Sequence, residues 1–226
     1  MTVSAPLSFM PEAVIFDMDG LMLDSERVSI ECRCRAAFDL EQQIEPDYWL
    51  QMVGVSDIAC HAQLSARIGA VPATALLARS DALYEAVVTK GVPHRPGIVT
   101  LLEWLFARGI PCAVGTSTRR PLALRKLNTA GLLWRFNAVC TASDVAQAKP
   151  APDIYLLAAH TLGIVPGRCL VVEDSPIGVR AALAAGMTPI QVPDLLMPDA
   201  QVSALGHRIV ASLTEVQSLL EACFDV

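Results

Sequence analysis

The sequence predicts an α/β protein built on a doubly wound parallel sheet with helices on both faces, interrupted early by an all-helical segment. From residue 96 onward, short apolar runs alternate with helix-like segments, which is typical of buried parallel strands joined by helices. Another apolar run, residues 13–16, ends in two carboxylates and a glycine. Between these regions, residues 27–94 carry only helical signals. We therefore expect this segment to be an insertion into the sheet-forming part.

Composition limits the classes of function. Apolar residues make up 53% of the 226 residues and charged residues 18%, which suits one large domain or a domain with an insertion. No apolar run approaches the length of about 18 residues that a membrane helix needs. Residues 1–10 lack the basic and apolar regions of a signal peptide. The net charge of −6 disfavours nucleic acid or an anionic membrane as the partner.

The seven cysteines do not form a recognisable framework. Their number is odd and no Cys-x-x-Cys spacing occurs, so neither a zinc site nor a set of disulfides is expected. Cys112, Cys140 and Cys169 lie in apolar strand-like runs, where a thiol acts as a small hydrophobe. These features favour a reducing cytoplasm. The composition is compatible with either a monomer or a homodimer.

The first predicted strand spans residues 13–16, because four consecutive apolar residues suit a buried strand. A helix running through Phe38 is expected next. Its N-cap is predicted to be Asp24 or Ser25, and Glu26 lies in its first turn.

Two further helices are predicted in the insertion. Ser56 is a candidate N-cap for a helix through Ile68. Pro72 is expected to open another helix that runs through Thr89 and ends at Gly91.

The remaining chain alternates strand and helix. The predicted strands span residues 110–116, 137–141, 169–173, 188–192 and 208–211, and the predicted helices span residues 98–108, 121–130, 152–162, 176–185 and 213–223. Since the strand at residues 13–16 belongs to the same sheet, the predicted domains are an α/β core, residues 1–26 and 95–226, and a helical cap, residues 27–94.

Polar residues gather where the predicted strands end, and open parallel sheets bind ligands at this edge. These residues are, in chain order, Asp17, Asp19 and Gly20, then Thr116, Ser117 and Thr118, then Lys149, then Glu173 and Asp174. Two carboxylates at the end of a buried strand need a cationic neighbour, most simply a divalent metal with oxygen ligands. The chain has only three lysines, Lys90, Lys126 and Lys149, and Lys149 is predicted at this edge.

Such a set of side chains suits phosphoryl transfer. The transferred group carries negative charge on its oxygens, and catalysis is mostly positioning and neutralisation of that charge. A metal and a lysine supply positive charge, while hydroxyls and backbone N–H groups hold the oxygens. One carboxylate can act as the nucleophile, giving an aspartyl-phosphate. A second carboxylate two residues on can protonate the leaving group and then activate water.

Four motifs occur in a fixed order: Asp-Met-Asp-Gly at residues 17–20, Val-Gly-Thr-Ser-Thr at 114–118, Lys-Pro-Ala-Pro-Asp at 149–153 and Val-Glu-Asp-Ser-Pro-Ile-Gly at 172–178. In this set the chain resembles the haloacid dehalogenase (HAD) superfamily, in the branch with β-phosphoglucomutase and small sugar-phosphate phosphatases. The resemblance covers essentially the whole chain. It implies a Rossmann-like core, with a helical cap at the position of residues 27–94.

The resemblance also implies catalytic roles for individual residues. Asp17 resembles the nucleophile and Asp19 the general acid/base. Lys149 would pair with both the phosphate and the nucleophile. Thr116 takes the phosphate-binding position, and Ser117 would present its backbone N–H to the phosphate.

A magnesium site is implied by the same resemblance. Its ligands would be Asp17, the backbone carbonyl of Asp19, and Asp174 together with Glu173, directly or through water. Three nearby residues are expected to have structural roles instead: Ser175 and Thr118 as helix caps, and Asp153 at the N-terminus of its helix.

The implied activity is a magnesium-dependent phosphatase for a small phosphorylated metabolite such as a sugar phosphate. The main alternative is a phosphomutase of the β-phosphoglucomutase type. The resemblance places basic cap residues of that enzyme at positions that are Ser29 and Asp57 here. Because a mutase must hold a doubly phosphorylated intermediate, their absence disfavours this alternative.

The sequence supports three other hypotheses about function less well. A carbon–halogen hydrolase needs no leaving-group acid such as Asp19. A carbon–phosphorus hydrolase needs a cap lysine, for which Lys90 at a helix end is the only candidate. A phospho-accepting signalling module needs neither a cap nor the Asp-x-Asp pair.

Overall fold

The computed structural model describes residues 7, 9–55 and 57–224 and confirms the predicted α/β class. One sheet of six parallel strands has the order β3-β2-β1-β4-β5-β6. In that order the strands are β3 (Ala138–Thr141), β2 (Cys112–Thr116), β1 (Ala13–Phe16), β4 (Cys169–Glu173), β5 (Thr188–Gln191) and β6 (Arg208–Ile209). In the register, Ile15 of β1 lies beside Ala113 of β2 and Val171 of β4. The residues that follow β1 are therefore central.

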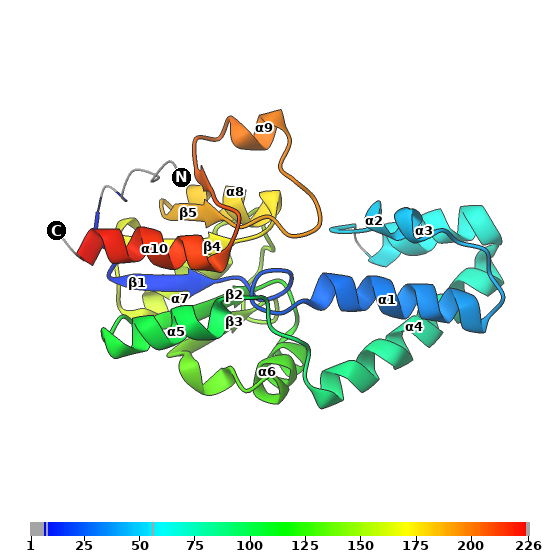
Figure 1. The fold of residues 1–226 in the computed structure, drawn as a ribbon. Coiled ribbons are helices and arrows are strands. Elements are labelled where there is room, and N and C mark those ends of the chain that lie inside the picture. Colours follow the sequence, from blue (N-terminus) through cyan, green and yellow to red (C-terminus); the bar gives the residue numbers. More distant parts are fainter. Residues whose placement is uncertain (1–6, 8, 56, 225–226) are drawn as a thin grey trace.

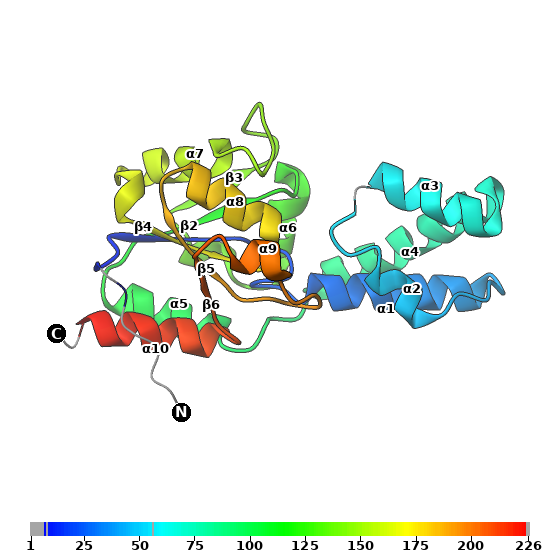
Figure 2. The same cartoon turned by 90° about the horizontal axis from the view of Figure 1, so that it is seen from above.

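Helices cover both faces of the sheet (Figures 1 and 2). One face carries α5 (Ile98–Ala107) and α10 (Leu213–Phe224), and the other carries α7 (Asp153–Leu162) and α8 (Pro176–Ala184). The remaining helical segments are α6 (Arg120–Thr129), α9 (Ala200–Ser203) and two short turns at Leu133–Arg135 and Pro166–Arg168. The doubly wound arrangement follows from strands that are apolar on both sides.

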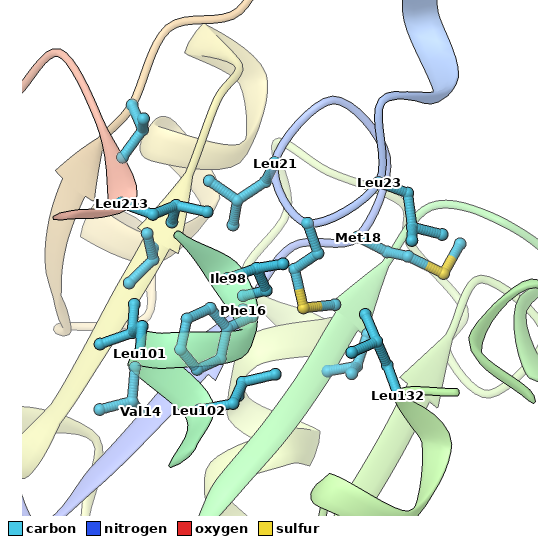
Figure 3. Close-up of a cluster of buried hydrophobic side chains, with 14 of the residues drawn as sticks. Val14, Phe16, Met18, Leu21, Leu23, Ile98, Leu101, Leu102, Leu132 and Leu213 are labelled. Carbon is cyan, nitrogen blue, oxygen red and sulfur yellow. The ribbon is translucent and has the colours of Figure 1, made fainter. Parts of the chain in front are cut away.

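Successive residues of β1 feed two separate apolar clusters, because side chains alternate between the faces of a strand. Val14 and Phe16 point to the α5 side, where Phe16 lies near Ile98 and Leu101 (Figure 3). Ile15 points to the α7 and α8 side. Cys112, Cys140 and Cys169 are buried in strands as predicted.

Four helices of the insertion lie to one side of the sheet, beyond the loop that follows β1 (Figure 1). They are α1 (Ser25–Asp39), α2 (Pro46–Leu50), α3 (Asp57–Ile68) and α4 (Ala70–Lys90). Their own apolar cluster is centred on Trp49, Leu64 and Leu76, all of which are fully buried. This second core allows the four helices to pack as a unit.

The two chain segments that connect this unit to the sheet are hydrogen-bonded to each other. Asp24 N–H donates to the carbonyl of Pro93 (2.8 Å), and Arg95 N–H donates to that of Met22 (2.9 Å). Asp24 occupies the N-cap position of α1, but its side chain makes no capping hydrogen bond and instead pairs with Arg27. The chain thus passes twice between the sheet and the four helices, and these hydrogen bonds hold the two connecting segments together.

Most predicted elements are confirmed with bounds that differ by a few residues, and β4 matches its prediction. Helix α4 begins at Ala70 rather than Pro72, since proline is tolerated within a first helical turn. The five-residue helix α2 was not predicted, because it is too short to show a helical period. The predicted cap Ser56 lies outside the described residues.

The loop between β3 and α7 is anchored by Asp144. Its carboxylate accepts hydrogen bonds from the N–H (2.8 Å) and hydroxyl (2.7 Å) of Thr141 and from the guanidinium of Arg120 (2.5 and 2.9 Å). The bonds from Arg120, joined by those from Thr141, lower the pKa of Asp144 to about 2.

We expect Asp144→Asn to lower the free energy of unfolding by no more than about 1 kcal/mol at neutral pH, because Asp144 is exposed and solvent screens its ion pair with Arg120. Because the pKa of Asp144 is lower in the folded chain than in the unfolded one, its contribution is present above about pH 4. It is lost as the pH falls towards about 2. Urea unfolding of both proteins at several pH values measures the difference, which should shrink on acidification. A difference that does not vary with pH contradicts the prediction.

Candidate active site

The structure brings side chains from four strand ends to one edge of the sheet. Asp17 and Asp19 follow β1, Thr116 ends β2, Lys149 lies in the loop after β3, and Asp174 follows β4. A cavity of about 310 Å³ at this edge is lined by every predicted site residue except Glu173. The structure therefore brings all but one of the predicted site residues to one cavity.

Lys149 lies between two carboxylates at the base of the cavity. Its Nζ is 2.6 Å from Asp17 Oδ1 and 2.7 Å from Glu173 Oε1. The lysine side chain is only 4% exposed. Burial opposes its charged form, but attraction to Asp17 and Glu173 outweighs burial and raises the pKa of Lys149 well above its usual value. Lys149 is therefore protonated, and its ammonium group contacts Asp17.

Glu173 does not line the cavity, and both oxygens of its carboxylate are bonded to other groups. Its Oε1 accepts hydrogen bonds from Lys149 and from the Tyr155 hydroxyl (2.8 Å). Its Oε2 accepts them from the N–H (2.9 Å) and hydroxyl (3.0 Å) of Ser175. A Cβ on Gly178 would lie 1.6 Å from Oε1, so only glycine leaves room for this carboxylate. Glu173 therefore holds Lys149 from behind.

The remaining carboxylates repel one another. Burial raises the pKa of Asp17 to about 7, with Lys149 opposing and Glu173 adding to the rise. Burial, followed by repulsion from Glu173 and Asp17, raises the pKa of Asp174 well above its usual value. Three carboxylates thus share one lysine, and a divalent cation would offset the excess negative charge.

The carboxylates of Asp17 and Asp174 suit Mg²⁺ better than a metal ion whose ligands all come from the protein. Among the described residues, no three histidine, cysteine or acidic side chains are grouped around a common point. Mg²⁺ keeps several waters and binds through one or two carboxylates. A Cβ on Gly20 would lie 2.4 Å from Asp174 Oδ2, so the glycine provides the space that Asp174 occupies. The donor set fits the predicted ion.

The three hydroxyl residues at and just after the end of β2, Thr116 to Thr118, do not all have the same role. Thr116 is buried, and its Oγ1 accepts the N–H of Thr118 (3.0 Å), which leaves its own proton available to a ligand oxygen. Ser117 is exposed and lines the cavity. The prediction of Ser175 as a helix cap is confirmed, since its hydroxyl accepts the N–H of Gly178 (3.1 Å).

Thr118 is not a helix cap, contrary to the prediction. Helix α6 begins two residues later, and Thr118 Oγ1 instead donates to Asp19 Oδ2 (2.6 Å). The other oxygen of Asp19 accepts a hydrogen bond from Lys126 Nζ (2.7 Å). Burial favours the neutral acid, but Lys126, with Thr118 and Ser25, lowers the pKa of Asp19.

Lys126 is the site residue that the sequence analysis missed. A helical projection indicates its position, since Lys126 lies three residues after Ala123 on α6 and four before the C-cap residue Ala130. Both Ala123 and Lys126 are buried. A lysine on the apolar face of an amphipathic helix is unusual unless it is paired. Its partner is not visible in the sequence.

Comparison with known proteins identifies the family of the chain. Residues 14–192 match the family model described as haloacid dehalogenase-like hydrolase. The chain belongs to this family. The family inferred from the four motifs is thereby confirmed.

Individual relatives of this haloacid dehalogenase-like hydrolase include two named phosphatases. Hexitol phosphatase A of Escherichia coli is 35% identical over 179 residues, covering 79% of this chain and 81% of the relative. A phosphorylated carbohydrates phosphatase of Thermotoga maritima is 30% identical over 221 residues, covering 93% and 91%. The crystal structure of a HAD family hydrolase from Deinococcus radiodurans, with bound phosphate and sodium, is 31% identical with a TM-score of 0.82, covering 94% of this chain and 96% of that chain.

None of the helices in residues 7, 9–55 and 57–224 is both long and apolar enough to cross a membrane.

Proposed function

We propose that this haloacid dehalogenase-like hydrolase is a magnesium-dependent phosphatase that acts on a small phosphorylated metabolite, preferably a sugar phosphate. The observation that carries the proposal is the 2.6 Å contact between Lys149 Nζ and Asp17 Oδ1 at the base of the cavity. It places a cation beside a carboxylate that can attack phosphorus. The names of the two phosphatase relatives support phosphorylated carbohydrates as the substrate class.

The proposed reaction has two transfers. An oxygen of Asp17 attacks phosphorus, so an aspartyl-phosphate bond forms while the bond to the leaving oxygen breaks. Asp19, which has to enter this step protonated, gives its proton to that oxygen and the alcohol departs. Water then attacks the aspartyl-phosphate and loses a proton to Asp19, which releases phosphate and restores both acids. Lys149 and Thr116 hold the phosphoryl oxygens throughout.

Magnesium, when bound, would supply positive charge next to the phosphoryl oxygens. Asp17, Asp174 and the backbone carbonyl of Asp19 would hold it. Glu173 would act only through Lys149, which it orients.

We further propose that residues 27–94 form a cap and that residues 20–27 and 91–97 are its hinges. Val53 and Gly54, from the chain between α2 and α3, line the same cavity as Asp17. Substrate would therefore bind between the cap and the sheet, and closure would exclude bulk water.

A second cavity, of about 300 Å³, lies among the cap helices and supports the choice of a monophosphate. Its lining includes one guanidinium, Arg33, and two carboxylates, Asp57 and Asp81, together with the hydroxyls of Ser29 and Tyr84. Carboxylates outnumber the single cation, so a second phosphate would be repelled, whereas the hydroxyls of a sugar can bond to all of these groups. This favours a monophosphate and disfavours the mutase alternative.

The test is phosphate release from a panel of hexitol phosphates, sugar phosphates and monoesters without a sugar. We expect release from at least one sugar monophosphate, its loss on chelation of divalent metal and its recovery on adding Mg²⁺. Mg²⁺ should also raise the melting temperature of the wild type, because it binds only the folded protein. Asp174→Asn should lose that shift.

Two results contradict the proposal. Release that persists without divalent metal excludes the magnesium requirement. No release from any ester, with interconversion of sugar-phosphate isomers after priming by a bisphosphate, identifies a mutase.

A further inference from the structure

Lys126 and Asp19 form a contact that connects α6 to the proposed active site. The side chain of Lys126 is 6% exposed, and its Nζ is 2.7 Å from Asp19 Oδ1. Thr118 Oγ1 lies 2.6 Å from the other oxygen of the same carboxylate. Two donors from different elements, the loop after β2 and helix α6, therefore bind the two oxygens of Asp19.

Among the described residues of α6, Lys126 is the one charged residue on the buried side, and it contacts Asp19. The neighbouring buried residues of α6, Ala123 and Leu127, are apolar. Removing one partner of a buried ion pair leaves the other charge uncompensated, so Lys126 also balances the charge of Asp19. The orientation of the Asp19 carboxylate is what the lysine adds to this charge balance.

The orientation of an aspartate carboxylate is otherwise loosely defined, because its χ2 torsion has a broad energy minimum. Hydrogen bonds to both oxygens remove this freedom. A carboxylate has about four acceptor positions, and Ser25 also bonds to Asp19, so about one position stays open for the transferred proton. Lys126 and Thr118 can therefore fix the plane of Asp19 and still leave it able to act.

A separate cavity adjoins this contact. It measures about 340 Å³ and is lined by Asp19, Lys126 and Thr118, together with Ser29 and Tyr84 from the cap helices α1 and α4. The Tyr84 ring centre is 5.0 Å from Lys126 Nζ, within the range of a cation–π contact. A group leaving from phosphorus in the catalytic cavity would meet Asp19 on the side that Lys126 and Thr118 define.

We propose that Lys126 is a positioning residue which, with Thr118, holds the carboxylate of Asp19 in the plane needed to protonate the leaving-group oxygen. This inference rests on the proposed phosphatase function. It assigns Lys126 no contact with the phosphoryl group, and the proton still moves from Asp19 to the leaving oxygen as the phosphorus–oxygen bond breaks.

The experiment compares two substrates that differ in their need for an acid. The alcohol of an alkyl monoester must be protonated to leave, whereas p-nitrophenolate leaves from p-nitrophenyl phosphate as a stable anion. The ratio kcat/KM covers the steps through departure of the leaving group, so it isolates the acid step. General acid catalysis contributes about 10²–10⁴-fold, and we expect Lys126→Met to lose roughly 10–100-fold of it on the alkyl ester. The aryl ester should change by less than about 3-fold.

Three further variants separate positioning from folding. Lys126→Arg, which retains a donor cation, should recover most of the alkyl activity. Thr118→Val removes only a hydroxyl and should show a smaller loss with the same selectivity. Lys90→Met replaces an exposed lysine at the end of α4 and should leave both kcat/KM values unchanged.

The outcomes distinguish this inference from the function on which it rests. Equal losses on both esters in Lys126→Met and Thr118→Val, or no loss on either, overturn the positioning role alone. If wild type and Asp17→Asn hydrolyse p-nitrophenyl phosphate equally, the proposed function fails and this inference fails with it.

Discussion

Asp17→Asn is expected to abolish phosphate release, with kcat at least about 1,000-fold below wild type. The amide of asparagine does not attack phosphorus as a carboxylate does, so no aspartyl-phosphate forms. The fold should persist, because the asparagine carbonyl oxygen can still accept the hydrogen bond that Lys149 donates to Asp17 (2.6 Å). The change also removes one of three crowded carboxylates, so the melting temperature should stay within a few degrees of wild type.

Initial rates at saturating substrate and Mg²⁺ measure this effect, and a thermal melt checks the fold. Asp153→Asn is a matched control, since Asp153 lies in the third motif but only begins helix α7. That variant should retain activity. Full activity of Asp17→Asn would contradict the assignment of the nucleophile and the mechanism built on it.

Lys149→Met is expected to reduce kcat/KM by at least about 100-fold and to lower the free energy of unfolding by roughly 3–5 kcal/mol. Both effects have one cause. Lys149 is the cation that faces Asp17 and Glu173, which is fully buried, and without it these carboxylates lie next to each other uncompensated. The phosphoryl oxygens lose the same positive charge.

The dependence on pH distinguishes this cause from simple loss of packing. Without Lys149, the pKa of Asp17, which is already raised to about 7, rises further, and the pKa of Glu173, which burial would raise but Lys149 holds low, rises as well. Ionised carboxylates then cost stability at high pH, and this cost falls as the pH decreases and they become protonated. Urea unfolding should therefore show a smaller difference from wild type at pH 5 than at pH 8.

Lys90→Met, at an exposed position, is the control for loss of a lysine and should unfold like wild type. An equal loss of stability in Lys149→Met at every pH would indicate a packing defect. Unchanged stability would show that the two carboxylates do not depend on Lys149.

Most of the active-site geometry could be predicted from the sequence because a parallel sheet brings all its strand ends to one edge. Once β1, β2 and β4 are recognised as buried apolar runs, the positions of Asp17, Thr116 and Asp174 follow from where each strand ends. The loop carrying Lys149 follows β3 in the same way. These are local patterns, and the fold class depends only on their order along the chain.

Only the tertiary structure shows in which direction the Glu173 side chain points. Glu173 and Asp174 are adjacent, and adjacent residues of a strand point to opposite faces. Which face carries the cavity depends on how α7 and α8 pack, since Tyr155 and Ser175 from these elements bind Glu173. No signal in the pair itself distinguishes the cavity-facing acid from the buried one.

By itself, then, the sequence determined the sheet, the order of its strands' motifs and the set of residues that meet at its edge. The tertiary structure alone decided that Lys126 and Thr118 bind Asp19, which lies 107 and 99 residues away from them in the chain. The physical reason is the separation along the chain over which a sequence pattern carries information. Helical and strand periods report on neighbours within a few residues, whereas the partner of a buried charge is set by packing between elements that are distant in sequence.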